Sequence, residues 1–348
     1  MKRFLAIFGR SALAGIAFAV TFCAGVALIL GGVAWWALRA SGPDDGVAFV
    51  ETCVAGVDDE KASKIVRVDI MGEIGPPAPS PVGDLLGGAL GTGGAAGADV
   101  ANGARKRIQL ATDDKSVKGL YIVIDSPGGD LTDSDLLWHD IQLFRAAQPG
   151  RFVFAHALAQ CCSGGYYVAA AADFIMALPT GEVGSIGIIS DYGYNVSDLA
   201  RRFGVSNVVV ATGENKDTLN PFKPVDPRQI AIEQGLIDSQ FARFVQVVAE
   251  GRKIPFEKVR ELADGRAYAA ADAVEKHLAD AVGYEEDALA KLEELAGGDV
   301  CVVVYEAPPD HEENFLKKLF GGKSNGSSAP SARRRYRGVP VPRLRLVR

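Results

Sequence analysis

The feature that most constrains the fold is VKGLYIVID, an apolar stretch at 117–125 that runs directly into the turn sequence SPGG. Apart from Lys118 near its start and Asp125 at its end it carries no charge, and β-branched side chains are frequent in it. Near-continuous apolar runs of this kind are typical of strands that are buried on both faces of a parallel sheet. Parallel strands need long crossover connections, which are usually helices. We therefore expect an α/β fold, provided that helical segments alternate with further strands.

The rest of the chain has this alternation. Strands are expected at 64–74, 117–125, 151–158, 173–179, 205–212 and 300–306, and helices at 105–114, at 131–147, after Ser163 and at 284–296. A long helix is expected from Asp226, because aspartate is a favoured N-cap and Pro227 suits the first helical position. Its apolar stripe, which includes Ile237 and Phe244, is more typical of core or of a subunit interface than of a ligand site. The order of elements predicts an α/β architecture with right-handed crossovers.

An uncharged segment at 11–38 lies close to the N-terminus. A helix needs about 20 apolar residues to cross a bilayer, so this segment is long enough. Trp35 and Trp36 lie near its end, where aromatic side chains favour the membrane interface. A cleaved secretory signal is the alternative, but signal cores have roughly 7–15 apolar residues. Basic residues within 1–10 place the N-terminus in the cytoplasm and the residues after the segment outside it.

These features divide the chain. We expect a cytoplasmic N-terminus at 1–10, a transmembrane helix at 11–38, a juxtamembrane segment at 39–63, the main domain at 64–305 with a Gly/Ala-rich loop at 75–104, and a C-terminal segment at 306–348. The last segment has a flexible linker and an Arg-rich tail, which could contact anionic lipid or nucleic acid, or could stay solvated without a partner. The net charge of −6 argues against a nucleic-acid-binding role for the chain as a whole.

The five cysteines define no metal site. No C-x-x-C pair and no Cys/His cluster occurs, so neither a metal nor another cofactor is predicted. Cys53 and Cys301 could pair in an oxidising compartment, and the sequence does not decide whether they do. Cys161 and Cys162 are adjacent and cannot easily bond to each other.

A serine stands between a predicted strand and a predicted helix in CCSGGYYVAAAAD, at 161–173. The glycines after Ser163 let the backbone turn sharply, so that the hydroxyl projects from the start of a helix, where free amides favour negative charge. A tetrahedral intermediate of acyl transfer needs hydrogen-bond donors near its oxyanion. The amide of Gly164 could supply one donor, and that of Gly128 or Gly129 the other. Ser163 is therefore a candidate nucleophile.

Serine is a weak nucleophile and needs a base. The chain has four histidines, and the local sequence favours a structural or solvated role for each: His139, His156, His277 and His311. Lysine can serve instead if burial or neighbouring groups lower its pKa from about 10.4. Lys216, in the turn-rich loop at 213–224, is the candidate, although such a lysine is by itself more typical of a solvated surface charge.

Four stretches, taken in order, resemble the successive motifs of the bacterial signal peptide peptidase A family. They are IDSPGGDLTDSD, CSGGYYVAAAADFIMALPTGEVGSIGII, NKDTLNPFKP and DGRAYAAADAVEKHLADAVG, and the likeness covers roughly 64 to 290. The resemblance implies a membrane-anchored serine/lysine endopeptidase with the fold shared by Clp protease and crotonase. Each motif occurs once, as in the short, single-repeat members, which form octamers in which serine and lysine can come from neighbouring subunits.

The resemblance also implies roles for individual residues. These are Ser163 as nucleophile, Lys216 as general base, Gly128, Gly129 and Gly164 as the oxyanion hole, and Ser185 as the residue that orients the lysine amine. The chain departs from the family at Asp125, where asparagine is frequent, and at Cys161 and Cys162, which replace small residues before the serine. We expect Cys162 only to fill space.

The implied substrates are apolar peptides, such as remnant signal peptides, at the inner membrane of a bacterium. The peptidase domain would lie outside the cytoplasm, and the chain would be a homo-oligomer. Three alternatives stay open: a Clp-class protease that acts with a membrane partner, a non-catalytic scaffold with the same fold, and a crotonase-type enzyme that binds acyl-CoA.

Overall fold

The computed structural model describes residues 50–59, 61–75, 100–191 and 193–306. The predicted transmembrane helix at 11–38, most of the Gly/Ala-rich loop and most of the C-terminal segment lie outside these residues. Within the described ranges, no helix combines the length and the apolar character that a bilayer crossing requires. The residues from Glu51 to Tyr305 belong to one compact unit, to which the description below is confined.

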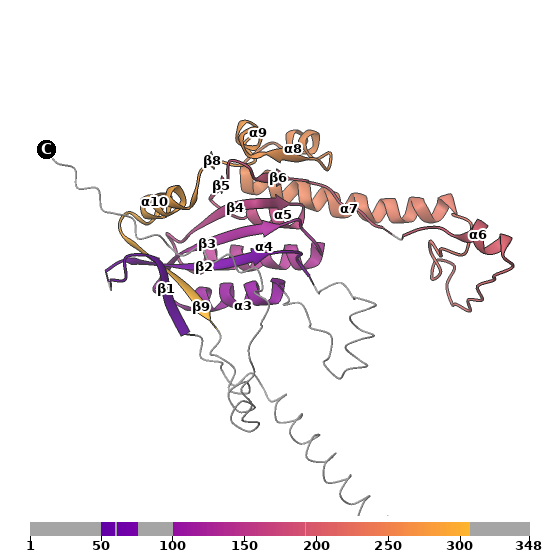
Figure 1. The fold of residues 1–348 in the computed structure, drawn as a ribbon, viewed down its shortest axis with the longest axis horizontal. Coiled ribbons are helices and arrows are strands. Elements are labelled where there is room, and N and C mark those ends of the chain that lie inside the picture. Colours follow the sequence, from indigo (N-terminus) through magenta and orange to yellow (C-terminus); the bar gives the residue numbers. More distant parts are fainter. Residues whose placement is uncertain (1–49, 60, 76–99, 192, 307–348) are drawn as a thin grey trace, which may run out of the picture. The chain divides into compact units, whose positions relative to one another are not determined.

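A largely parallel sheet forms the centre of this unit (Figure 1). Its strands are β1 (Val50–Gly56), β2 (Ser63–Met71), β3 (Val117–Ser126), β4 (Phe152–Cys162), β5 (Phe174–Ala177), β6 (Glu182–Gly184), β7 (Ala267–Ala269), β8 (Ala281–Val282) and β9 (Val300–Glu306). The main order is β1-β9-β2-β3-β4-β5-β8, while β6 pairs with the end of β4 and, antiparallel, with β7. The predicted α/β class is confirmed.

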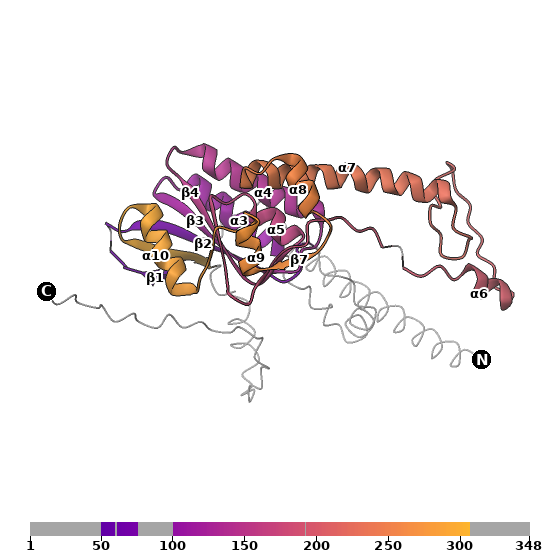
Figure 2. The same cartoon turned by 90° about the horizontal axis from the view of Figure 1, so that it is seen from above.

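Helices cover both faces of the sheet (Figures 1 and 2). They are α3 (Val100–Asp113), α4 (Leu131–Ala147), α5 (Gly164–Ala169), α6 (Ser197–Arg202), α7 (Pro227–Arg252), α8 (Phe256–Leu262), α9 (Ala270–Glu275) and α10 (Glu285–Ala296). On one face α3, α4 and α5 pack against one another and against the strands. On the other, Leu292 of α10 packs into a buried cluster with Tyr121 and Val123 of β3. Burial of β3 on both faces is what its apolar sequence predicts.

Most of the predicted elements are present, and their ends follow local sequence signals. The helix predicted at 131–147 has these bounds, and the Asp130 side chain caps it by accepting the amide of Asp133 at 2.9 Å. The helix predicted from Asp226 is α7, whose N-cap side chain accepts the amide of Arg228. The helix predicted at 105–114 begins earlier, at Val100, because it continues into the end of the Gly/Ala-rich loop.

One predicted strand is wrong. Residues 205–212 form no strand in the structure. Their side chains include Val208 and Val210, which are 86% and 96% exposed. A strand needs a neighbour to accept its backbone hydrogen bonds, and none of the described strands lies beside this segment. The β-branched sequence of this segment favours a strand, but no strand among the described residues pairs with it.

A disulfide joins the two strands nearest the ends of the described unit. Cys53 of β1 and Cys301 of β9 are bonded, with their Cα atoms 6.0 Å apart and 248 positions apart in sequence. This answers the question that the sequence left open. A crosslink that closes so long a loop lowers the conformational entropy of the unfolded chain, and it is therefore expected to stabilise the fold.

Candidate active site

Ser163 lies at a sharp turn between β4 and α5. It is the N-cap of α5 and has φ 49° and ψ −121°, a conformation that side-chain-bearing residues rarely adopt. Its amide donates to the carbonyl of Gly184 at 2.8 Å, and its carbonyl accepts the amide of Tyr167 at 2.9 Å. The turn is therefore held by β6 on one side and by the first turn of α5 on the other. The serine side chain remains partly exposed, whereas Gly164 and Gly165 are buried.

The SPGG turn, residues 126–129, lies directly in front of this serine. Strands β3 and β4 are parallel neighbours, so their carboxyl ends meet at one edge of the sheet, where Ser126 pairs with Cys161. Gly128 has φ +109°, and a β-carbon on it would lie 2.6 Å from Ser163 Cβ, 2.8 Å from the Gly164 nitrogen and 3.0 Å from Ser163 Oγ. Glycine is therefore required at 128 for conformation and for space, and the space borders the serine hydroxyl and a free amide.

Two amides face this space. As the first residue of α5, Gly164 has an amide with no acceptor inside the helix. A β-carbon on Gly164 would lie 3.3 Å from the Gly129 nitrogen, so the two amides are close together. No acceptor for the Gly129 amide lies in the part of the chain that the structure describes. The Gly128 amide, by contrast, donates to Ser126 Oγ at 3.1 Å. The geometry favours Gly129 and Gly164 as the oxyanion donors.

Ser134 is a site residue that the sequence did not indicate. It is fully buried in α4, its hydroxyl donates to the Asp130 carbonyl at 2.8 Å, and a β-carbon on Gly164 would come within 2.4 Å of that hydroxyl. Ser134 thus packs directly beneath the serine turn and explains why position 164 must be glycine. The only sequence signal was the small, polar residue inside an apolar helix face.

Lys216 lies elsewhere in the chain. It is exposed, and its amide donates to the Gly213 carbonyl at 3.2 Å in the turn-rich loop. This loop is fastened to the N-terminal end of α7, where the Leu219 amide donates to Gln229 Oε1 at 3.1 Å. The lysine is therefore carried at the end of α7 that lies next to α6 (Figure 1).

The other end of α7 contacts the serine helix. The rings of Tyr167 in α5 and Phe244 in α7 lie 4.9 Å apart. From Gln229 to Phe244 the helix rises about 22 Å. The structure consequently does not bring Lys216 to Ser163 within one chain.

Ser185, the predicted partner of the lysine, lies on the serine side. It follows Gly184, whose carbonyl accepts the Ser163 amide, and it has φ 50°. Its hydroxyl donates to the Gly265 carbonyl at 3.1 Å and its amide to the Arg266 carbonyl at 2.9 Å. The structure therefore brings together four of the predicted site residues: Gly128, Gly129, Ser163 and Gly164. Ser185 lies close to them, and only Lys216 lies apart.

Known proteins with similar sequences identify the family. The sequence pattern of peptidase family S49 matches residues 145–299. The chain is 36% identical to a protein named as signal peptide peptidase SppA in Enterococcus faecium. The aligned 220 residues cover 63% of this chain and 61% of that protein. It is also 35% identical to a protein named as a protease in Synechocystis sp.. The aligned 228 residues cover 65% of this chain and 80% of that protein.

A third relative, named as a protease in Methanocaldococcus jannaschii, is 36% identical over 222 residues, or 63% of this chain and 68% of that protein. The chain belongs to peptidase family S49. It is therefore a serine peptidase, as the resemblance of its motifs predicts. The match to the Enterococcus faecium relative spans less than two thirds of that protein.

None of the described histidines of this S49 peptidase forms a hydrogen bond with Ser163. His156 is 2% exposed and lies on β4. It pairs with Val123, which is three β3 residues, or about 10 Å, before the Ser126–Cys161 pair at the end of the two strands. Its Nδ1 lies 3.0 Å from the Tyr121 hydroxyl, and burial lowers its pKa to about 4. His139 and His277 are exposed on α4 and after α9. His311 lies outside the described residues.

The departures from the family pattern have structural explanations. Asp125 accepts the Gln160 amide at 3.0 Å, where the register between β3 and β4 shifts. Cys161 and Cys162 are buried, and burial raises the pKa of both thiols. Both thiols therefore stay protonated and do not compete with the serine as nucleophiles. This agrees with the expectation that Cys162 fills space.

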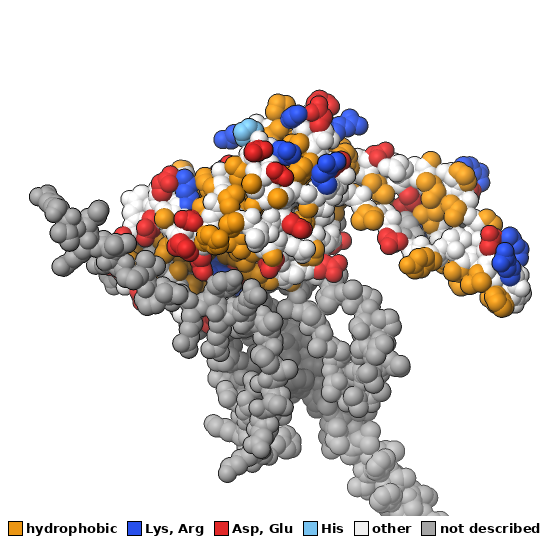
Figure 3. Space-filling model, turned by 45° about the horizontal axis from the view of Figure 1, so that its top comes forward, with side chains coloured by type: hydrophobic (Ala, Val, Ile, Leu, Met, Phe, Trp, Pro, Cys, Tyr) orange, Lys and Arg blue, Asp and Glu red, His pale blue; other side chains and the backbone are white. Residues whose placement is uncertain are grey.

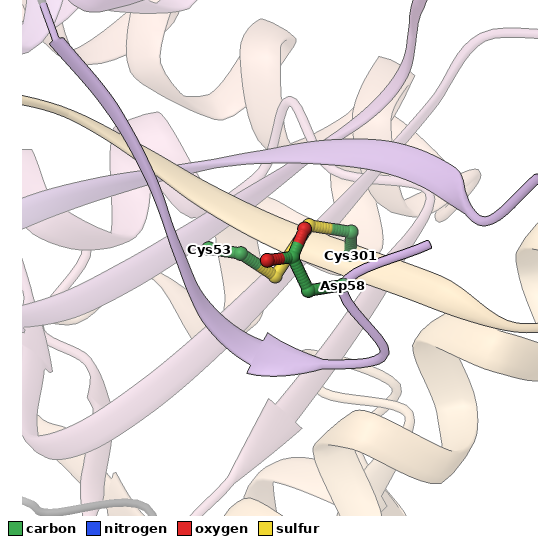
Figure 4. A group of neighbouring side chains, drawn as sticks. All are labelled: Cys53, Asp58 and Cys301. Carbon is green, nitrogen blue, oxygen red and sulfur yellow. A yellow bond between two sulfur atoms is a disulfide. The ribbon is translucent and has the colours of Figure 1, made fainter. Parts of the chain in front are cut away.

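A separate group of possible metal ligands lies at the opposite edge of the sheet. Ligand atoms of Cys53, Asp58 and Cys301 are all within 4.8 Å of one another (Figure 4). Cys301 pairs with Lys64 at the start of β2, whereas Ser163 follows the carboxyl end of β4. Metals bind cysteine as thiolate, and these two sulfurs are joined in a disulfide. This S49 peptidase therefore has no metal-ligand set at this group while the disulfide is intact.

Proposed function

We propose that the protein is a membrane-anchored serine/lysine endopeptidase whose site is completed by a neighbouring subunit. Ser163 is the nucleophile, and Lys216 of a second copy is the general base. This proposal rests on the separation of the candidate serine and the candidate lysine within one chain. The serine turn is complete within one chain, whereas the lysine is held about 22 Å away along α7.

The proposed chemistry follows from the geometry of the turn. A neutral Lys216 amine takes the proton from Ser163 Oγ, which attacks the peptide carbonyl. The amides of Gly129 and Gly164 stabilise the negative oxygen of the tetrahedral intermediate. The ammonium then protonates the leaving amine, and the same lysine activates the water that hydrolyses the acyl-enzyme. Ser185, which follows the residue whose carbonyl accepts the serine amide, would hold the incoming amine.

The surface of the lysine-bearing region supports an oligomer. We call residues 189–191 and 193–236 the arm. Most of its large apolar side chains are at least 42% exposed in one chain: Ile189, Tyr194, Leu199, Phe203, Val205, Val208, Val209, Val210, Phe222, Val225, Ile230, Ile232 and Leu236. Figure 3 shows such side chains gathered at the end of α7. Patches of this kind mark protein–protein interfaces, and a second copy would also offer pairing for 205–212. The octamer is inferred from the resemblance of the motifs.

The location and substrates are part of the proposal. The name of the Enterococcus faecium relative points to signal peptides, and the apolar segment at 11–38 would hold the peptidase near them in the inner membrane, with its N-terminus inside. The disulfide between Cys53 and Cys301 supports a peptidase domain outside the cytoplasm, because disulfides persist in oxidising compartments. The Arg-rich tail would then contact anionic lipid.

Single substitutions test the assignment. In the full-length protein in detergent, Ser163→Ala and Lys216→Ala should each abolish hydrolysis of an apolar fluorogenic peptide. Lys253→Ala removes another exposed lysine, at the other end of α7, and should leave the rate unchanged. Hydrolysis by Ser163→Ala at the wild-type rate would overturn the nucleophile, and a fully active Lys216→Ala would overturn the base.

A further inference from the structure

Three helices that carry the parts of the proposed site meet at one carboxylate. Helix α4 begins just after the SPGG turn, α5 begins after Ser163, and α7 leads back to the arm with Lys216. Asp135 is in the second turn of α4, and its side chain is 41% exposed. Side chains from α5 and α7 both reach it.

The contacts converge on a single oxygen. The Tyr167 hydroxyl donates to Asp135 Oδ1 at 2.5 Å. Arg243 donates to the same oxygen from Nη2 at 2.9 Å and from Nε at 3.2 Å. Tyr167 is fully buried, and its amide donates to the Ser163 carbonyl, so one helical turn separates this network from the nucleophile. An exposed ion pair alone contributes little free energy to stability. The buried Tyr167 hydroxyl, however, gives the pair of Arg243 and Asp135 a fixed geometry.

Packing also holds α7 against α5 beside the hydrogen bonds of Arg243. The Arg243 guanidinium lies 4.8 Å from the centre of the Trp138 ring, and the Phe244 ring packs against Tyr167. Near the end of α7, a β-carbon on Gly251 would lie 1.8 Å from the Ala170 carbonyl oxygen, so the two backbones touch there. The direction of α7 is therefore set by this contact and by the network at Arg243.

Arg243 lies where α7 leaves the core. Phe244, Val245, Val247 and Val248 are buried, whereas Ile230, Ile232 and Leu236 are 45%, 52% and 56% exposed. The helix rises about 21 Å from Gln229 to Arg243, so a tilt of about 5° at Arg243 would move the lysine loop by about 2 Å. Displacements of about 1 Å can lower a rate about 100-fold when reacting groups must be aligned.

We infer that Asp135, through Tyr167 and Arg243, is a positioning residue that fixes the direction in which α7 presents the Lys216 arm. The inference rests on the proposed function. Asp135 touches neither the serine nor the lysine, and it acts through the helices that carry them. Its loss should therefore lower the rate of acylation without weakening peptide binding at the serine turn.

The test uses Arg243→Met, with Arg145→Met as a matched control. Arg145 also forms an ion pair, 2.5 Å from Asp173, and both arginine side chains are 38% exposed. The two partners of Arg145, Asp173 and the Ala171 carbonyl at 3.4 Å, lie in the connection between α5 and β5, outside α5 and α7. We expect Arg243→Met to lower kcat about 10-fold with KM within about 2-fold of wild type. The rate at which a small acylating reagent labels Ser163 should fall in parallel, and Arg145→Met should change neither.

Conservative variants separate positioning from folding. Tyr167→Phe removes only the hydroxyl, and its effect on kcat should not add to that of Arg243→Met if the two act through one carboxylate. Arg243→Lys keeps the charge and should recover part of kcat but not all, since it cannot donate twice in the same geometry. Thermal midpoint and oligomer mass are measured for every variant.

Each outcome decides. If Arg243→Met behaves like Arg145→Met while Ser163→Ala and Lys216→Ala are inactive, the positioning role is wrong and the proposed function stands. If kcat falls only in proportion to lost folding or lost oligomer, the positioning role is equally overturned. If Lys216→Ala stays active, the proposed function itself fails, whatever Arg243→Met does.

Discussion

The serine turn and the arm differ in how completely one chain can build them. Around the turn, the residues from Gly164 to Ala170 are all buried, and hydrogen bonds from β6 and α5 hold the serine in an uncommon backbone conformation. In the arm, Val208 and Val210 are almost fully exposed, and none of the described strands pairs with the β-branched segment at 205–212. The first region is shaped by packing inside the chain, and the second has the composition of a surface that packs against another chain.

The difference indicates how this peptidase would be controlled. A serine turn that is complete in every monomer would supply the oxyanion donors, whereas the candidate base, Lys216, is held at the other end of α7. Activity would then require assembly, which brings an arm from one copy to the turn of the next. The following predictions test the two halves of this contrast separately.

The largest effect is expected from Gly128→Ala. A methyl group there would lie 2.8 Å from the Gly164 nitrogen and 3.0 Å from Ser163 Oγ, inside the proposed oxyanion site. We expect kcat/KM to fall about 100- to 1,000-fold, the size of effect seen when an oxyanion donor is lost. Gly150→Ala is the control, because Gly150 also has a positive φ, +85°, but opens onto empty space. Equal losses for both variants would show that backbone strain, and not blocked space, is responsible.

The next effect concerns the arm. Val210→Asp changes a side chain that is 96% exposed in one chain, so the monomer fold should be unaffected. If this surface is an interface, the buried charge should lower the oligomer mass in light scattering and reduce kcat at least about 10-fold. Leu143→Asp, at a 49% exposed position on α4, is the control. An intact, active oligomer of Val210→Asp would contradict the role given to the arm.

The disulfide provides a change that should leave the site alone. Replacing Cys53 and Cys301 together by serine should lower the free energy of unfolding by about 2–5 kcal/mol, because a loop of 248 positions is no longer closed. The peptidase rate at 25 °C should stay the same, since the pair lies at the edge of the sheet opposite Ser163. Urea unfolding with and without reductant measures the first effect, and reductant should not change the double variant. A large loss of activity would show that β1 influences the serine turn.

The smallest effect at neutral pH is expected from His156, which should act on the pH dependence of stability. Burial lowers the pKa of His156 from 6.5 to about 4, so between these values the unfolded chain binds the proton more strongly. Stability should therefore fall as the pH drops through this window, and His156→Gln should flatten that fall without changing kcat at neutral pH. His139→Gln, at an exposed position, should do neither. Loss of activity in His156→Gln at neutral pH would reopen the histidine alternative.

The sequence predicted what local patterns determine. The apolar run at 117–125 indicated a doubly buried strand, and the turn residues at its end and at Ser163 indicated two facing turns, because neighbouring parallel strands end at one edge. It could not predict that 205–212 stays unpaired among the described residues, since strand propensity does not show whether another strand lies beside the segment. Ser134 and Asp135 were missed for another reason: their roles arise from contacts with helices that are distant in sequence, and the only local sign was the small, polar side chain of Ser134 in an apolar helix face.

Mixing two inactive variants tests the central claim most directly. Ser163→Ala and Lys216→Ala oligomers are dissociated, combined and reassembled, and the exchange of subunits is verified by mass spectrometry. If the site is formed by two chains, the mixture should regain a substantial fraction of wild-type peptidase activity, because one copy supplies the serine and its neighbour the lysine. A verified mixture that remains inactive would contradict a site completed by a second subunit.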